Sequence, residues 1–172
     1  MRKSKSASYI VLRKKPTVRT GLNELDVITE HNSVFDKAGS VAVGKFGVSW
    51  HQSKCDEFSA CIKNGSTIYL LLVSRTAKGF NGFRARIRDI QLANNKILPQ
   101  FPPYYNLLNR QPSLRETALA TKPSMWFRIA ERLKPYPLLN LSLLTNKRPL
   151  LDVLNECRTT MMLVVDSRKE NN

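Results

Sequence analysis

The fold follows most directly from one apolar run, Thr67-Ile68-Tyr69-Leu70-Leu71-Leu72-Val73. A continuous run of this length, without charge or proline, is typical of a central strand that is covered on both faces. A turn at residues 77–79 follows it, and Phe80-Asn81-Gly82 then leads into another strand. The sequence therefore predicts two successive strands joined by a short turn, with the first of them in the interior of a sheet.

The second of these strands alternates between apolar and basic side chains. Because successive side chains of a strand point to opposite faces, the pattern places Phe83, Ala85 and Ile87 on one side and Arg84, Arg86 and Arg88 on the other. Guanidinium forks match phosphate oxygens bidentately, so this row of arginines favours phosphate binding. The alternative is a solvated strand whose charges protect it against aggregation.

A helix is predicted directly before the central strand, over residues 54–64. Its apolar residues Cys55, Phe58 and Ile62 recur at spacings of three and four. Ser53 can cap the start of this helix, and Asn64-Gly65 can end it.

The other predicted elements are shorter. Strands are expected at 9–12, 41–48, 125–130 and 161–165, and a helix runs from Pro149 to Arg158 with Leu150, Leu151 and Leu154 as its buried face. Two glycines interrupt the strand at 41–48, which indicates a bulge or a place where another stretch of chain approaches the backbone. The polar, acidic segment 20–37 predicts a loop with one helical turn at most.

The segment 94–122 has no periodicity and combines several prolines with the aromatic residues Phe101, Tyr104 and Tyr105. A loop of this length inside a compact domain is usually either functional or disordered. Two adjacent tyrosines that follow two prolines favour an ordered loop or lid.

The charge balance is the unusual feature of the composition. The chain has 28 Lys and Arg against 13 Asp and Glu, which gives a formal net charge of +15 over 172 residues. This excess predicts a polyanion as the partner. The alternative is that positive charge merely keeps the protein soluble, although acidic residues usually serve that purpose better.

The length fits a single domain that buries a sizeable core. We expect a basic N-terminal tail at 1–8, one domain at 9–166 and a disordered tail at 167–172. The three cysteines form no CxxC pair, which argues against a disulfide scaffold or a zinc ribbon and favours a reducing compartment. The apolar run 9–12 is too short for a signal peptide or a membrane span, so an intracellular protein of the cytoplasm, nucleoid or nucleus, without membrane contact, is predicted.

Trp50 lies in the stretch Phe46-Gly47-Val48-Ser49-Trp50-His51-Gln52-Ser53, just before the predicted helix. An indole face gives an extracted base a large apolar partner, while nearby cations hold its phosphates. The sequence therefore predicts a base-stacking residue at the rim of a basic fold. The alternative is a core tryptophan, since indoles are mostly buried.

The order of Trp50, helix, apolar strand, Phe80-x-Gly82 and alternating strand resembles the YTH domain and the wider group of EVE and other PUA-like folds. The segment Met125-Trp126-Phe127-Arg128-Ile129 and the helix at 150–158 follow in the order of that family. The resemblance covers roughly half of the chain. It implies an α+β fold with a small mixed β-barrel core flanked by short helices.

The resemblance also implies an aromatic cage for a modified base, N6-methyladenine in YTH domains and modified cytosine in several EVE-like ones. The first cage tryptophan of the family falls on Trp50, and the second cage aromatic would come from Phe101, Tyr104 or Tyr105. Ser49 and His51 are the nearest candidates for polar contacts with the base. Trp126 matches a strand tryptophan of the core, and Tyr104 and Tyr105 have the alternative of packing against the prolines of their own loop.

Six basic residues are predicted to bind phosphates: Arg13, Lys14, Lys78, Arg84, Arg86 and Arg88. The predicted function is to hold a flipped, methylated base of single-stranded RNA, because flipping costs less in a single strand than in a duplex. Three alternatives stay open. They are a DNA-recognition module of a modification-dependent restriction system with a separate motor or nuclease subunit, a PUA-like ribonucleoprotein component that ignores methylation, and a metal-dependent nuclease.

No catalytic motif is found in the sequence. The patterns GxxxxGK[ST], HExxH, GxSxG and paired carboxylates are all missing. His51 with Cys55 and Cys61 gives a conceivable metal cluster, but there is no second histidine to complete a recognised spacing. We therefore expect a binding protein that is not an enzyme and needs no metal or cofactor.

Overall fold

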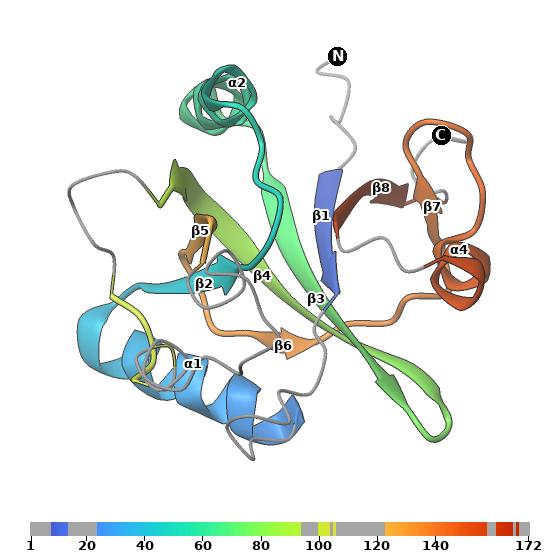
Figure 1. The fold of residues 1–172 in the computed structure, drawn as a ribbon, viewed down its shortest axis with the longest axis horizontal. Coiled ribbons are helices and arrows are strands. Elements are labelled where there is room, and N and C mark those ends of the chain that lie inside the picture. The colour runs from blue at the N-terminus through green and yellow to red at the C-terminus, as the bar shows by residue number, and fades with distance from the viewer. Residues whose placement is uncertain are drawn as a thin grey trace, which may run out of the picture.

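The computed structural model describes residues 8–13, 24–93, 100–103, 105, 123–157, 161–166 and 168. Lys14, Tyr104, most of the predicted loop 94–122 and nearly all of the two predicted tails lie outside the described residues. Within these residues the protein is α+β (Figure 1). Its elements are β1 (Ser8–Arg13), α1 (Glu24–Ala38), β2 (Val41–Lys45), α2 (Gln52–Lys63), β3 (Ile68–Thr76), β4 (Gly79–Leu92), β5 (Met125–Ile129), β6 (Lys134–Pro135), β7 (Leu141–Leu143), α4 (Leu150–Glu156) and β8 (Met161–Asp166).

The strands form one mixed, eight-stranded sheet. Its order is β2-β5-β4-β3-β1-β8-β7, and β6 pairs with β4 off this path. β1 and β3 are parallel, and the other pairs are antiparallel. The path begins at β2 and ends at β7, so the sheet is open. The mixed core flanked by helices is confirmed, but in the described residues the expected barrel is not closed.

β3 and β4 form the hairpin that the apolar run predicts. Tyr69 pairs with Arg86 at one end, and Thr76 pairs with Gly79 at the two-residue turn. β3 lies between β4 and β1, and its residues 70–73 are buried. The prediction of a central strand covered on both faces is confirmed.

Each face of the sheet has its own core. The first contains Ile10, Leu70 and Leu72, against which α1 and α2 pack through Ile28 and Cys55. The second contains the intervening residues of the same strands, against which α4 packs; these include Tyr9, Val11, Leu71 and Val73. The two-residue period of β1 and β3 thus sends neighbouring side chains into opposite cores.

α1 corrects the sequence-based prediction of a loop at 20–37. The helix covers 24–38, and between residues 26 and 38, where burial is described, the buried positions are Ile28, His31 and Asn32. His31 and Asn32 are polar, so they hide the helical period that apolar residues would have displayed. Both are held by hydrogen bonds: His31 Nδ1 lies 2.8 Å from the Val27 carbonyl oxygen, and the Asn32 amide pairs with the backbone of Leu133.

Gly44, one of the two glycines of the 41–48 segment, lies where other residues approach the backbone closely. A Cβ on Gly44 would lie 2.8 Å from Pro123 Cγ and 2.9 Å from Tyr105 Cε1, so another stretch of chain does approach the backbone here. The Gly44 amide donates to the Tyr105 hydroxyl at 2.8 Å, and the Ala42 amide donates to the Gln100 carbonyl at 2.7 Å. Gln100 and Tyr105 therefore cover part of the outer edge of β2, which would otherwise be free to pair with another chain.

The helix ends differ in detail from the predictions. α2 begins at Gln52 after His51, with no side-chain cap, so the prediction that Ser53 caps the helix is wrong. Its predicted end is confirmed, since Asn64 follows the helix and Gly65 has a φ of +85°. α4 is shorter than predicted, and its buried residues are Leu150, Val153 and Leu154, with Leu151 half-buried. None of the helices in the described part of the chain has the length and apolar character needed to cross a bilayer.

Candidate nucleic-acid interface

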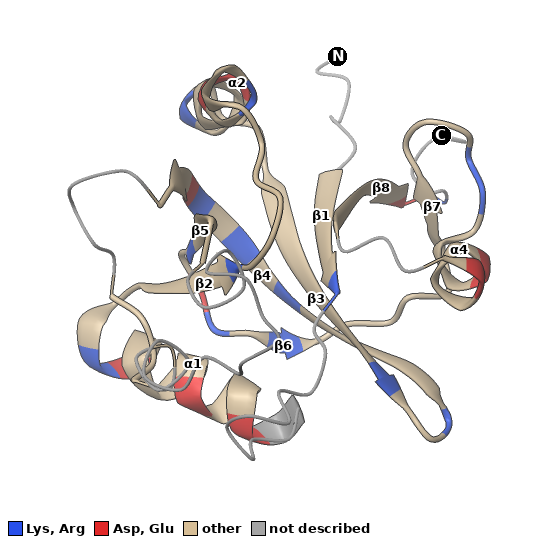
Figure 2. Ribbon diagram, viewed as in Figure 1, with Lys and Arg blue, Asp and Glu red and all other residues tan. Residues whose placement is uncertain are grey.

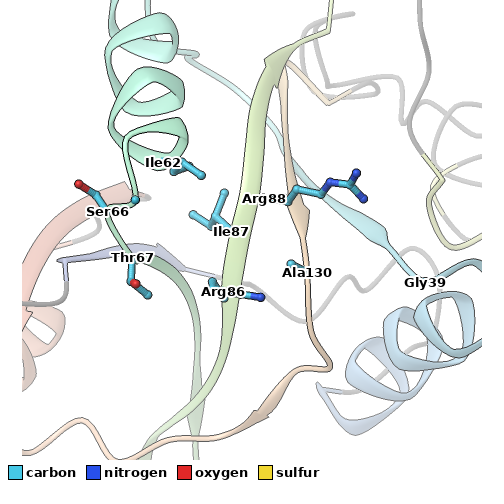
Figure 3. Close-up of a pocket in the computed structure, with 9 residues that line it drawn as sticks. Gly39, Ile62, Ser66, Thr67, Arg86, Ile87, Arg88 and Ala130 are labelled. Carbon is cyan, nitrogen blue, oxygen red and sulfur yellow. The ribbon is translucent and has the colours of Figure 1, made fainter.

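The alternation predicted for β4 is present in the structure. Its apolar residues Phe83, Ala85 and Ile87 are buried, whereas Arg86 and Arg88 are exposed. The register with β5 shifts after Ile87, because Ile87 pairs with Ile129 and Asp89 pairs with Arg128. Arg88 is therefore the extra residue of a β-bulge, a feature that re-aims side chains. Figure 3 shows the side chains of Arg86 and Arg88 on the same side of β4 and Ile87 on the other, toward Ile62.

The charges of Arg86 and Arg88 are not neutralised. Among the described residues neither guanidinium forms an ion pair, whereas the nearby Arg128 and Arg132 are paired with Asp89 and Asp36. Glu131 lies close to Arg86, but its carboxylate accepts the hydrogen bond of the Arg86 backbone amide at 2.9 Å. Figure 2 shows basic residues following β4 and reaching β6. Lys134 on β6 sits directly opposite Arg84 and adds a further exposed cation to this row.

A concavity of about 440 Å³ opens beside these arginines. It lies between the C-terminal end of α2, the start of β3, β4 and the residue that follows α1 (Figure 3). Its lining residues are Gly39, Ile62, Gly65, Ser66, Thr67, Arg86, Ile87, Arg88 and Ala130. The volume is in the range of small-molecule sites. Two guanidiniums and two hydroxyls supply the hydrogen-bond donors that a phosphate or a ribose needs.

Arg84 differs from its neighbours because two tyrosines enclose it. Its guanidinium carbon lies 4.3 Å from the ring centre of Tyr69 and 4.2 Å from that of Tyr136. The Tyr136 hydroxyl is 2.9 Å from the hydroxyl of Tyr9, and burial together with this hydrogen bond raises the pKa of Tyr9 above its usual value. These contacts hold the segment after β6 against the sheet. Arg84 is thus half-buried and packed within the fold.

The other predicted phosphate ligands have different environments. The Arg13 guanidinium donates to the carbonyls of Leu154 and Cys157 at the end of α4, so it caps that helix. Lys78 is exposed in the turn of the β3–β4 hairpin. Near that turn, the guanidiniums of Arg13 and Arg75 lie 5.5 and 5.8 Å from the Phe80 ring centre. Phosphate binding by Arg13 would cost it the bonds that cap α4.

Trp50 is half-buried at the start of α2. Its ring centre is 4.9 Å from that of Phe58, with an angle of 31° between the planes, and it meets the buried Phe127 edge-on at 6.4 Å. The ammonium of Lys54 lies over the indole, 4.6 Å from its centre. Ser49 and His51 on either side are exposed. The indole thus packs partly on the first core and retains a solvent-accessible part between two polar residues.

Phe101 and Tyr105 belong to a separate aromatic cluster around Trp126. Phe101 stacks on Trp126 with ring centres 5.0 Å apart, and Tyr105 meets Trp126 edge-on at 5.1 Å. Tyr105 is 1% exposed, and its hydroxyl accepts the Gly44 amide and lies 3.3 Å from His31 Nε2. The structure therefore does not bring Phe101 and Tyr105 to Trp50, because Gln100 and Tyr105 are hydrogen-bonded to the edge of β2 instead. Trp126, 5% exposed, is a core residue as predicted.

The loop between β2 and Trp50 contains a feature that the sequence analysis missed. Lys45 is 3% exposed, and its ammonium donates to the carbonyls of Phe46, at 3.1 Å, and Val48. Burial lowers the pKa of Lys45 below its usual value. Val48, at the tip of this loop, is 87% exposed. A lysine that ends an otherwise apolar strand was the available indication of such a buried cation.

No protein-family model matches the sequence, and no curated protein shows significant similarity to it. Within the part of the chain that the structure describes, the protein is α+β with an open mixed sheet, and Arg86 and Arg88 of β4 are exposed and form no ion pair. No group of three or more His, Cys, Asp or Glu side chains in the described ranges is arranged to hold a metal ion.

Proposed function

We propose that the protein binds a nucleic-acid strand through the basic surface of β4. The observation that carries this proposal is the pair Arg86 and Arg88, which project to the same side beside a polar concavity and form no ion pair with any residue that the structure describes. Cations left unpaired next to such a concavity suit the phosphates of a polyanion. The net charge of +15 supports the same partner class.

The narrower proposal is that Trp50 stacks a base extruded from that strand, with Ser49 and His51 near its polar edge. Trp50 lies at the N-terminal end of α2, and the concavity lies at its C-terminal end. A twelve-residue helix spans about 18 Å, so one strand a few nucleotides long can reach both places. A single strand pays less to expose a base than a duplex does, which favours RNA or unpaired DNA.

The resemblance to the YTH and EVE group supports a methylated base, such as N6-methyladenine, as the ligand of Trp50. A methyl group on the exocyclic amine adds apolar surface that an indole can cover. In this proposal the open mixed sheet is a PUA-like core. Phe58 lies 4.9 Å from Trp50 between ring centres, which leaves no room for a base between the two rings, so in this proposal Phe58 supports the indole and the base stacks on Trp50 alone.

Fluorescence anisotropy with short single-stranded RNA and DNA, each with and without N6-methyladenine, tests both levels of the proposal. We expect the double variant Arg86→Gln/Arg88→Gln to weaken binding to all sequences and to reduce the salt slope by about two. Arg132→Gln/Arg148→Gln, which removes two exposed arginines that are paired with Asp36 and Glu156, is the charge-matched control and should bind normally. Unchanged affinity in the double variant would overturn the proposed surface.

Trp50→Ala is expected to lose the preference for the methylated strand and to keep the general affinity. Circular dichroism and thermal unfolding show whether the variant is folded. Retained discrimination in a folded Trp50→Ala protein would remove Trp50 from the site while leaving the basic surface in place.

A further inference from the structure

Lys54 occupies a position that a stacked base would need. Its ammonium is 4.6 Å from the centre of the Trp50 ring, and both residues are half-buried. The other ring partners of Trp50 are Phe58 and Phe127, which pack on or within the first core. Lys54, unlike Phe58 and Phe127, is a flexible side chain that can leave the indole without disturbing the core. A base can stack on the face beneath its ammonium only after that ammonium has moved.

Lys54 lies near the N-terminal end of α2. Lys54 lies in the first turn of the helix, which contains no acidic residue. The positive end of the helix dipole repels a cation placed there. Lys54 also forms no ion pair with a described residue, so the indole face is its main partner. An anion arriving near Trp50 would give the ammonium a stronger partner than the ring.

From these contacts we infer that Lys54 is an exchangeable cover of Trp50. In the free protein the ammonium lies on the indole. When a base stacks, the ammonium leaves the ring and pairs with a phosphate of the bound strand. Lys54 is thus a specificity-determining residue of the proposed site, because it opposes stacking by a ligand without phosphate and supports stacking by a ligand that carries one. This inference rests on the proposed base stacking at Trp50.

Two probes separate the opposition of Lys54 to stacking from its support of phosphate binding. The nucleoside N6-methyladenosine has no phosphate, and a short RNA with one central N6-methyladenine has several. Both are titrated against tryptophan fluorescence, and Trp50→Phe identifies the part of the signal that comes from Trp50 rather than Trp126. In Lys54→Ala we expect the nucleoside to bind about two- to fivefold tighter, since it no longer competes with the cation. The RNA should bind more weakly, with a salt slope lower by about one.

Two further variants complete the experiment. Lys54→Arg keeps a cation that can cover the ring and pair with phosphate, so it should restore the behaviour of the unmodified protein with both probes. Lys63→Met removes a lysine at the other end of α2 and should leave nucleoside binding unchanged. If Lys54→Ala shifts both affinities in the same direction, or shifts neither, the inference is overturned while base stacking stands. If neither probe changes the Trp50 signal of the unmodified protein, the proposed stacking fails and the inference fails with it.

Discussion

Lys45 illustrates how much of the site depends on single side chains. A buried ammonium is costly unless it is well hydrogen-bonded. Its partners here are two backbone carbonyls of the following loop, and the described residues provide no carboxylate to pair with it. The contact fixes the backbone between β2 and Trp50. The sequence predicts a strand that continues past Lys45 to residue 48, so a lysine within an otherwise apolar strand indicated burial, but nothing in the local sequence indicates its two carbonyl partners.

The lowered pKa of Lys45 predicts a pH dependence of stability. The unfolded chain keeps the usual pKa of 10.5, so between the folded and the unfolded pKa the unfolded state binds more protons. The contribution of Lys45 to the free energy of unfolding therefore rises with pH through this window, and it is lost as the pH falls through the folded pKa. Urea unfolding from neutral pH to about 10.5 should show this rise as the difference between the unmodified protein and Lys45→Met. Parallel curves for the two proteins would contradict it.

At the scale of elements, apolar periodicity was enough to predict β1, β2, β3, β4, β5, β8 and the helices α2 and α4. α1 was missed because two of its inward positions hold His31 and Asn32, whose burial depends on partners far away in the sequence. The pairing of Phe101 and Tyr105 with Trp126 was missed for a related reason. It follows from the hydrogen bonds that Gln100 and Tyr105 form with the edge of β2, and no local sequence pattern indicates those bonds.

Gly82 of β4 lies against the segment 136–138, which follows β6. A Cβ at this position would lie 2.6 Å from Leu138 Cδ2 and 2.9 Å from the Tyr136 carbonyl oxygen. Gly82→Ala should therefore push the segment 136–138 away from β4 and lower the free energy of unfolding by about 1–3 kcal/mol. The exposed neighbour Asn81→Ala should change it by less than about 0.5 kcal/mol. Chemical denaturation of both variants measures the difference. Equal free energies of unfolding would show that the segment 136–138 shifts without loss of stability.

At the scale of the whole molecule, salt should lower the general affinity for nucleic acid but should not change the preference for a methylated base. Phosphate contacts release counterions, so the general affinity for single strands should fall by orders of magnitude between about 50 and about 200 mM salt. Stacking of a neutral base on Trp50 is not screened in this way. The ratio of affinities for methylated and unmethylated strands should therefore stay constant over the same range. Anisotropy titrations at several salt concentrations measure both quantities, and a ratio that falls with the affinity would mean that discrimination is electrostatic.

The position of β1 inside the sheet has a consequence for biosynthesis. β1 ends at Arg13 and pairs with β3 on one side. Its other edge pairs with β8, which begins only at Met161. On the ribosome that apolar edge stays open until residues 161–166 have emerged, and an open edge recruits strands from other molecules. A nascent or truncated chain without residues 161–166 is therefore the form most exposed to aggregation and most dependent on chaperones.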